Sequence, residues 1–196
     1  MLTQKRPLSS VLIVSGSAKG VSFIRALLEP SAFSPVTVVS NAGEAKRQLI
    51  AASFDIIIID TPLSDEFGYE LAVNLASDTQ SGILLLVRNE NYEHIANRVE
   101  VYGVFTVAKP VTKLSFYHSV RLVVATRERM RVLEKKNSTL QSKMDEIRLV
   151  NRAKWVLIDR LSMTEPQAHH YIEKQAMDMR LSRREVAENI IKAHEA

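Results

Sequence analysis

The chain has no cysteine among its 196 residues. This absence excludes disulfide bonds, thiolate catalysis and cysteine-based zinc sites, and it fits a reducing cytoplasm. Glycine and proline are scarce, at six residues each, whereas 46% of the residues are apolar. Such a composition is typical of a folded protein and not of a disordered one. The N-terminal segment has only a short apolar run, so we expect a cytoplasmic protein with no signal peptide and no membrane association.

The first 120 residues have no excess of positive charge, since they contain 10 Lys and Arg against 11 Asp and Glu. Residues 121–196 contain 16 Lys and Arg against 11 Asp and Glu, so the net charge of +4 arises in the C-terminal part. A basic C-terminal part favours a polyanionic partner such as a nucleic acid. A solvated charged surface is the alternative.

Catalytic patterns are also missing. The five histidines have no metal-site spacing, and the adjacent rings of His169 and His170 point apart on a predicted helix. The segment SGSAKG at 15–20 lacks the spacing of a glycine-rich phosphate loop. We therefore predict a protein that is not an enzyme and that has no metal and no cofactor.

Short apolar runs alternate with helical patterns through the first 120 residues. The runs are apolar throughout, as expected of strands covered on both faces, and lie at 11–14, 36–39, 56–59, 83–87 and 104–107. The helical patterns lie between them, near 19–29, 42–52, 67–76 and 91–101. This order predicts an α/β domain at 8–120 with a five-stranded parallel doubly wound sheet. In such a sheet, ligand chemistry is found at the carboxyl ends of the strands.

Four positions in this domain follow a recognisable pattern. Asp60 ends the third run, Gly68 follows in a turn, Gly103 precedes the fifth run, and Lys109-Pro110 ends it. With this spacing, residues 10–120 resemble the receiver domain of two-component response regulators. The resemblance implies that Asp60 is equivalent to the phosphoryl-accepting Asp of a phosphorelay.

Other positions depart from the receiver pattern. The acidic pair that holds Mg²⁺ in the family is replaced by Ser15 and Gly16, and its Thr or Ser after the fourth strand is replaced by Val87. Since a dication needs several oxygen ligands, Asp60 should be a poor phosphoryl acceptor. We predict a degenerate receiver in which Asp60 and Lys109 form a permanent ion pair. Residual phosphorylation of Asp60 is the alternative.

The stretch from Ser115 to Asp159 contains no glycine and no proline. Apolar residues recur in it with a seven-residue period, which is typical of a two-stranded coiled coil. We predict a coiled-coil linker helix at 121–150 that forms a homodimer, and the seam residues are Val123, Met130, Leu133, Asn137, Leu140, Met144 and Ile147. Asn137 would fix the register by pairing with its own copy. The alternative is a single amphipathic helix packed on its own domain.

Two capping-box patterns follow the linker helix. They begin at Thr164 and Ser182 and predict helices at 165–179 and 183–194. Together with the end of the linker helix, which includes Trp155 and Leu161 as expected core positions, they should form a small three-helix all-α domain at 151–194.

Motifs in this last domain carry a second resemblance. The residues are Ala153-Lys154, Met163-Thr-Glu-Pro-Gln-Ala168, Ala176-Met177 with Arg180, and Val186-Ala187 with Ile190. With these motifs, residues 150–191 resemble the ANTAR domain, an RNA-binding module of transcription antitermination regulators. The resemblance implies that the domain binds paired RNA hairpins.

RNA loops are read by stacking of splayed bases and by cations that contact phosphates. The candidate RNA-binding residues are Arg152, Lys154, Arg160, His170, Lys174, Arg180 and Arg183, of which Lys154 and Arg180 lie within the matched motifs. Tyr171 and Arg184 are weaker candidates, and helical spacing favours a core position for Tyr171.

The leading interpretation is a dimeric antitermination regulator that binds hairpins in nascent mRNA. One alternative is a phosphorylation-gated two-component response regulator that acts on DNA. A second is a protein-interaction module controlled by a regulatory protein, and a sensor kinase is also a conceivable partner.

Overall fold

The computed structural model describes residues 8–194. It divides into two compact units: an N-terminal unit that ends at Arg131 and a C-terminal unit that begins at Val132. In the N-terminal unit, the described residues form a five-stranded parallel sheet in the order β2-β1-β3-β4-β5. The strands are β1 (Ser9–Ser15), β2 (Phe33–Val39), β3 (Ile56–Asp60), β4 (Gly82–Arg88) and β5 (Phe105–Lys109). The predicted doubly wound sheet is confirmed.

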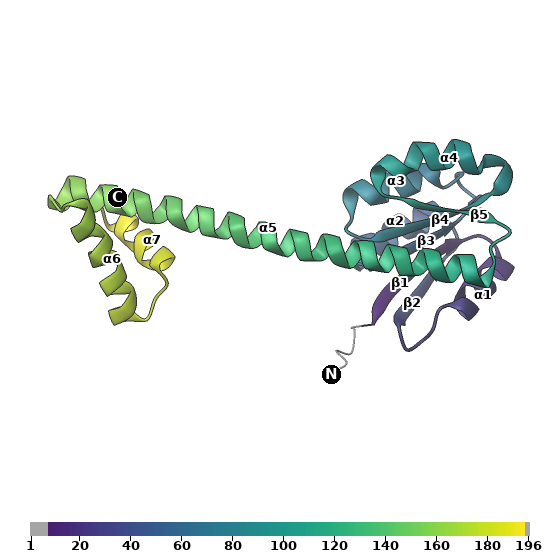
Figure 1. Ribbon diagram of the computed structural model, residues 1–196, viewed down its shortest axis with the longest axis horizontal. Helices are drawn as coiled ribbons and strands as arrows, with labels where there is room; N and C mark the ends of the chain where they lie inside the picture. Colours follow the sequence, from purple (N-terminus) through teal and green to yellow (C-terminus); the bar gives the residue numbers. More distant parts are fainter. Residues whose placement is uncertain (1–7, 195–196) are drawn as a thin grey trace. The chain divides into compact units, whose positions relative to one another are not determined.

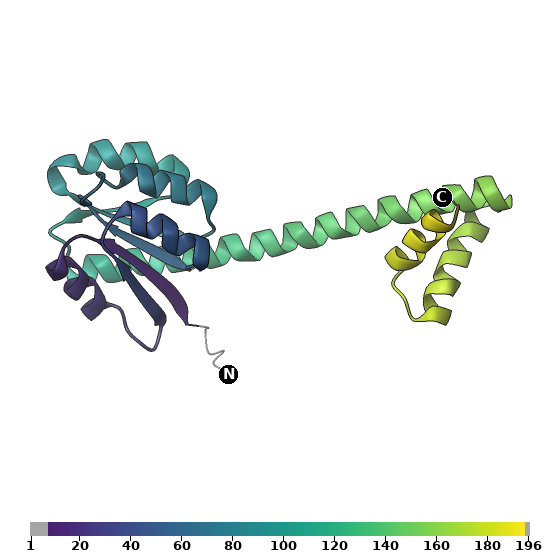
Figure 2. The same cartoon turned by 180° about the vertical axis from the view of Figure 1, so that it is seen from behind.

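Helices cover both faces of this sheet. On one face lie α1 (Ala18–Leu27) and the first turns of α5 (Lys113–Leu161), which pack on Val11, Ile13 and their neighbours (Figure 1). On the other face lie α2 (Ala42–Ala51), α3 (Tyr69–Asp78) and α4 (Tyr92–Val99), as the view from behind shows (Figure 2). Short 3₁₀ turns, η1 (Asn89–Asn91) and η2 (Glu100–Tyr102), flank α4. Because both faces are covered, the apolar side chains of β1, β3 and β4 are buried on both.

Local sequence determines where the helices begin. Ser17 caps α1 by accepting a hydrogen bond from Gly20 N, and Asn41 caps α2 in the same way from Glu44 N. The predicted third helix begins later than expected, at Tyr69, because Gly68 takes a left-handed conformation with a φ of 103°. A side chain at Gly68 would be strained in that conformation.

The first turns of α5 lie close to the beginning of β4. Val123 is fully buried with Phe116 and Val120 in the core between α5 and the sheet. A Cβ atom on Gly82 would lie 2.4 Å from Val123 Cγ1, so the absence of a side chain at Gly82 permits this approach. The prediction that Val123 lies in a dimer seam is therefore wrong, because its side chain is covered by its own sheet.

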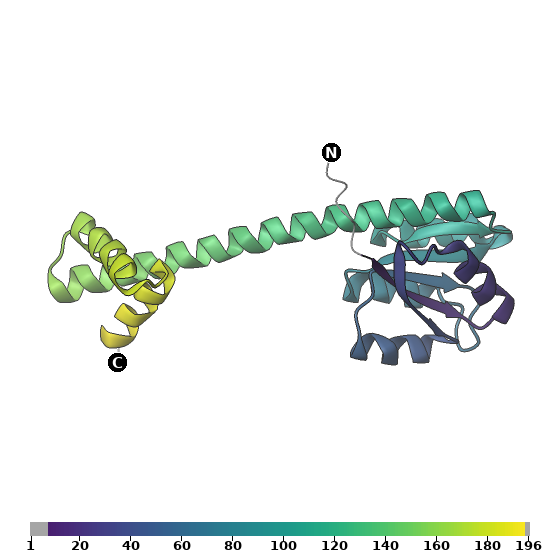
Figure 3. The ribbon, with the colours of Figure 1, turned by 90° about the horizontal axis from the view of Figure 1, so that it is seen from below.

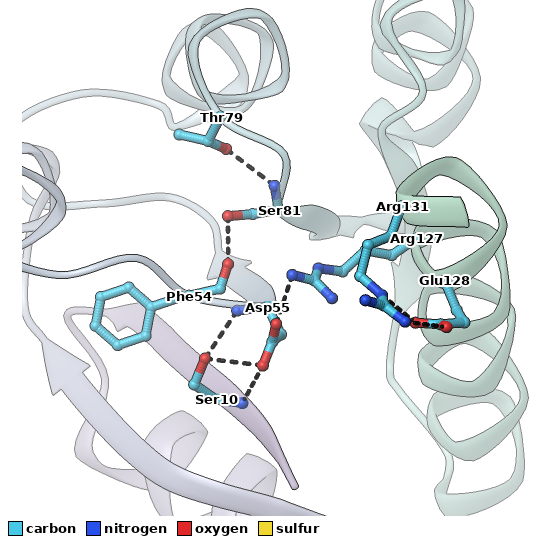
Figure 4. Close-up of polar contacts among 8 residues, drawn as sticks. All are labelled: Ser10, Phe54, Asp55, Thr79, Ser81, Arg127, Glu128 and Arg131. Atoms are coloured by element: carbon cyan, nitrogen blue, oxygen red, sulfur yellow. Dashed lines mark hydrogen bonds and ion pairs between the residues drawn. The ribbon is translucent and has the colours of Figure 1, made fainter. Parts of the chain in front are cut away.

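An ion pair holds α5 at the same end of the sheet. Asp55, just before β3, accepts hydrogen bonds from Ser10 N and Ser10 Oγ, at 2.7 and 3.0 Å. Its other oxygen lies 2.5 Å from Arg127 Nη2 on α5. Figure 4 shows Asp55 between β1 and α5, while Arg131 turns away toward Glu128. Asp55 and Arg127 are both mostly covered, and their ion pair joins α5 to the edge of the sheet.

The C-terminal unit is helical. The last turns of α5 pack with α6 (Glu165–Met179) and α7 (Arg183–His194) (Figure 3). Their shared core contains Ala153, Leu157, Ala168, Ile172, Val186, Ala187 and Ile190. Both capping boxes are present: Thr164 N donates to Gln167 Oε1 and Ser182 N donates to Glu185 Oε2. The hydrogen bond from Ser182 N lowers the pKa of Glu185.

Two expected core residues of this unit face solvent instead. Trp155 is 71% exposed and Leu161 is 46% exposed. Trp155 lies two residues from Ala153 and from Leu157, which are buried, so it falls on the opposite face of the helix. None of the helices in residues 8–194 has an apolar stretch of the length needed to cross a bilayer.

Gly82→Ala tests the docking of α5. The new Cβ would collide with Val123, so we expect a loss of about 1–3 kcal/mol in the free energy of unfolding of the N-terminal unit, measured with urea. Combining it with Val123→Ala, which removes the colliding methyl group, should cost less than the sum of the two single changes.

Gly43→Ala is the matched control. It lies within α2 and its Cβ would have no neighbour closer than 3.5 Å, so it should be neutral or slightly stabilising. Equal effects of Gly82→Ala and Gly43→Ala would contradict the packing described here.

Candidate functional site

The strand register brings the candidate receiver residues together. Ser15 at the end of β1 is opposite Asp60 at the end of β3, and Arg88 at the end of β4 is opposite Lys109 at the end of β5. These ends lie at the carboxyl edge of the sheet, beside the point where the strand order reverses between β1 and β3. Ligands bind at this position in open α/β sheets.

Asp60 is almost fully engaged with its neighbours. One carboxylate oxygen forms an ion pair with Lys109 Nζ, and the other accepts a hydrogen bond of 2.7 Å from Ser15 Oγ. Lys109 Nζ also donates to the carbonyl oxygen of Thr61. Asp60 is only 8% exposed. The predicted ion pair between Asp60 and Lys109 is thus present.

Gly20 in α1 makes this arrangement possible. A Cβ atom at this position would lie 2.3 Å from Asp60 Oδ2 and 3.2 Å from Ser15 Oγ. A side chain at Gly20 would therefore push Asp60 away from Ser15. Sequence reasoning does not single out Gly20 as a site residue, and its only signal is its place one helical turn after the Ser15-Gly16 pair.

The residues do not fit the Mg²⁺ that a receiver fold implies. Ser15 supplies a hydroxyl group that already donates to Asp60, and Gly16 supplies no side-chain oxygen. Among the described residues, the structure groups no three His, Asp or Glu side chains in a way that could hold a metal ion. A dication needs several oxygen ligands, preferably charged, and only the paired carboxylate of Asp60 is present here.

Val87 is buried, whereas its neighbour Arg88 is exposed. The Val87 side chain is fully buried in the core under α3 and α4, so it cannot reach a ligand at the sheet edge. Arg88 is exposed and lines an open cavity of about 470 Å³ together with Lys19, Asp60 and Lys109. With Val87 buried, β4 contributes Leu86 and the charged side chain of Arg88 to the cavity lining. Lys19, like Gly20, is a cavity residue that sequence reasoning does not identify.

Several candidate RNA-binding residues of the C-terminal unit form ion pairs, among them Lys154, Arg183 and Arg160, whose Nε lies 3.5 Å from Asp159 Oδ2. Lys154 Nζ lies 2.7 Å from Glu165 Oε1, and the Lys154 side chain is only 17% exposed. The hydrogen bond and charge of Lys154 lower the pKa of Glu165. Arg183 Nη2 lies 3.3 Å from Glu146 Oε1. Lys154 therefore ties α5 to α6, and Arg183 ties α7 to α5.

The other candidates are exposed. His170 and Lys174 lie on α6, and Arg152 and Arg160 lie on α5. Arg180 follows α6 as its C-cap and takes a left-handed conformation with a φ of 54°. Tyr171, expected in the core, is 37% exposed. Helical spacing alone therefore assigned Trp155 and Tyr171 to the core, whereas both side chains are exposed.

The remaining seam residues are accessible. Met130, Leu133, Leu140, Met144 and Ile147 are between 49% and 60% exposed, and Asn137 is exposed. A single chain thus leaves these apolar side chains in water.

Comparison with known proteins agrees with both units. Residues 138–191 match the family model of the ANTAR domain. The transcriptional regulatory protein PdtaR of Mycobacterium tuberculosis is 26% identical over 157 residues, which cover 79% of this chain and 77% of the relative. The C-terminal unit therefore contains an ANTAR domain.

Solved structures resemble the N-terminal unit. The receiver domain of an HD domain-containing protein from Pseudomonas fluorescens Pf-5 has a TM-score of 0.57 at 17% identity and covers 67% of this chain and 96% of its own. The chemotaxis response regulator CheY4 of Vibrio cholerae has a TM-score of 0.53 at 21% identity and covers 60% and 99%. The first unit therefore has the receiver fold, and it precedes the residues that match the ANTAR domain.

The occupied carboxylate leads to a prediction about phosphorylation. Incubation with acetyl phosphate and Mg²⁺ should leave the intact mass of the protein unchanged, because Ser15 and Gly16 offer no charged oxygen ligands for a metal and both oxygens of Asp60 have partners. A variant carrying Ser15→Asp and Gly16→Asp is the matched comparison, since it adds two carboxylates at the metal-holding positions and should gain Mg²⁺ affinity. A phosphoryl adduct on the unaltered protein would contradict the prediction.

Proposed function

We propose that this protein is a transcription antitermination regulator that binds paired hairpins in nascent mRNA through its ANTAR domain. The observation that carries the proposal is the match of residues 138–191 to that domain. The likeness to a transcriptional regulatory protein over most of both chains supports it. In this proposal the protein acts by binding in the cytoplasm and catalyses no reaction.

The charge of the C-terminal unit supports a nucleic-acid partner. Lys174 and Arg180 lie on or after α6, are exposed, and have no acidic partner within an ion-pair distance among the described residues. Such cations are available to neutralise phosphates and to release their counterions. Arg180 and Lys174 are therefore better candidates for direct RNA contacts than Lys154 and Arg183, whose cations already pair with Glu165 and Glu146.

The exposed heptad residues support a homodimer. Five large apolar side chains in the heptad register of α5, interrupted once by Asn137, would be buried if two copies of the helix paired. A dimer would present two ANTAR domains, and two linked weak contacts gain affinity through their effective concentration. This fits a target made of two hairpins.

The input to the regulator has to differ from ordinary phosphorylation. Asp60 is paired with Lys109 and lacks metal ligands, so a sensor kinase is a poor source of the signal. A regulatory protein or a small molecule acting on the N-terminal unit is the better-supported input.

The Arg180→Gly variant distinguishes a loss of RNA binding from a loss of protein stability. Arg180 has a left-handed backbone conformation that glycine adopts without strain, so the change should preserve or raise the melting temperature. Removal of its guanidinium should nevertheless weaken hairpin binding and lower the salt slope of log K by about 1. Gel shifts with hairpin RNA and duplex DNA at several salt concentrations measure both effects.

Lys135→Gln is the matched control for this experiment. It also removes one exposed positive charge from the C-terminal unit, but it lies before the matched ANTAR residues and should leave hairpin affinity unchanged. If Arg180→Gly and Lys135→Gln weaken binding equally, Arg180 makes no specific contact with RNA. Equal affinity for hairpin and duplex DNA would remove the proposed function.

Leu140→Asp tests the dimer. Leu140 is 60% exposed in the single chain, so the change should leave each fold intact, whereas in a paired helix it would bury an unpaired carboxylate. We expect the dimer dissociation constant to rise by at least about 100-fold, as measured by analytical ultracentrifugation.

Thr139→Asp is its control, since Thr139 is exposed next to Leu140 but lies outside the heptad seam. Sedimentation of the Leu140→Asp variant like the unaltered protein would show that this seam does not join two copies.

A further inference from the structure

The cavity at the carboxyl edge of the sheet is lined by more positive than negative side chains. Lys19, Arg88 and Lys109 line it, and Asp60 is the one acidic side chain among the described lining residues. That carboxylate is already engaged by Lys109 and Ser15. Lys19 and Arg88 are therefore left without a charged partner inside the cavity, and the only ion pair of Arg88 found among the described residues is a solvent-exposed one with Glu90 at 3.6 Å.

The same cavity has an apolar wall. Phe23 is 41% exposed and lies on α1 one turn after Lys19. The other apolar lining residues are Ile24, Pro62, Leu86, Pro110 and Val111. A volume of about 470 Å³ lies within the range of small-molecule sites, which combine apolar walls with a few placed polar groups. The first turn of α1 has no acidic residue, so its N-terminus does not oppose an anion.

We propose that this cavity binds a small organic anion, a phosphonate- or carboxylate-type group on an apolar body, in place of the metal and phosphoryl group of a receiver. Lys19 and Arg88 would contact the anionic group, while Phe23 would contact the apolar body. Asp60 and Lys109 remain paired and form the floor. Binding is non-covalent, so no phosphoryl transfer and no metal is involved.

The cavity is well placed to influence the helix that continues into the ANTAR domain. Val111 lines the cavity and lies two residues before α5, whose first turn is capped by hydrogen bonds between Thr112 and Ser115. This regulatory consequence rests on the proposed function, whereas anion binding itself does not. The two can therefore be measured separately.

Phenylphosphonate is a suitable probe, because its phosphorus–carbon bond prevents phosphoryl transfer to Asp60. Calorimetry with the full chain in EDTA should detect one saturable site per chain, with weaker binding of inorganic phosphate and none of benzyl alcohol. Arg88→Gln and Lys19→Gln should each weaken phenylphosphonate binding by about tenfold, because each removes a charge-assisted contact. Phe23→Ala should weaken phenylphosphonate but leave inorganic phosphate unchanged.

Arg47→Gln is the matched control: it removes one exposed charge from α2 on the other face of the sheet. Binding by Arg88→Gln and Lys19→Gln that equals that of Arg47→Gln would overturn the proposal. So would equal binding of benzyl alcohol, or no saturable binding of phenylphosphonate at millimolar concentration.

Hairpin affinity measured with saturating phenylphosphonate tests the regulatory consequence. A change in the unaltered protein that is lost in Arg88→Gln supports it. If the anion binds but hairpin affinity stays constant, the regulatory role is overturned while the site stands. If no hairpin binds under any condition, the proposed function fails, and calorimetry still decides whether the cavity is an anion site.

Discussion

The ion pair between Asp60 and Lys109 determines what the N-terminal unit can do. It gives one oxygen of the Asp60 carboxylate a cationic partner, and the hydroxyl group of Ser15 donates a hydrogen bond to the other oxygen. Removing either partner would leave a covered charge without compensation, which is strongly destabilising. Gly20 is part of the same constraint, because a side chain there would collide with Asp60 Oδ2. The receiver fold is thus retained with partners on both oxygens of the carboxylate at the acceptor position.

Because Asp60 is already paired, the other cations around it have no carboxylate left to bind among the described residues that line the cavity. In a metal-bound site, cations at the sheet edge balance a phosphoryl group, whereas here Lys19 and Arg88 remain beside a carboxylate that is already neutralised. The burial of Val87 adds to this, since β4 then contributes a cation to the cavity and no hydroxyl group. The positive charges of Lys19 and Arg88 inside the cavity are therefore balanced by solvent ions or by a ligand that carries its own negative charge.

Sequence patterns predicted the fold well where the signal is local. Apolar runs located the strands, because both sheet faces are covered, and capping boxes located α6 and α7. Sequence patterns failed where the same residue spacing along a helix fits two different environments, such as a dimer seam and a core of the same chain. Val123 fits the heptad register but faces its own sheet, and Trp155 fits helical spacing but faces solvent. The pair of Lys154 with Glu165 joins residues eleven positions apart on different helices, so no local pattern could reveal that this cation is engaged.

The burial of Val123 also limits how strongly two copies could pair. The seam can begin only near Met130, where the apolar positions become exposed, and it ends near Ile147. About three heptads remain, which is close to the shortest length at which a heptad pattern specifies a coiled coil. Asn137 lies within this short seam, and in a paired helix it would lower the stability of pairing while fixing the register. A seam of this length would pair only marginally, and the equilibrium of such a pairing responds to small changes in free energy.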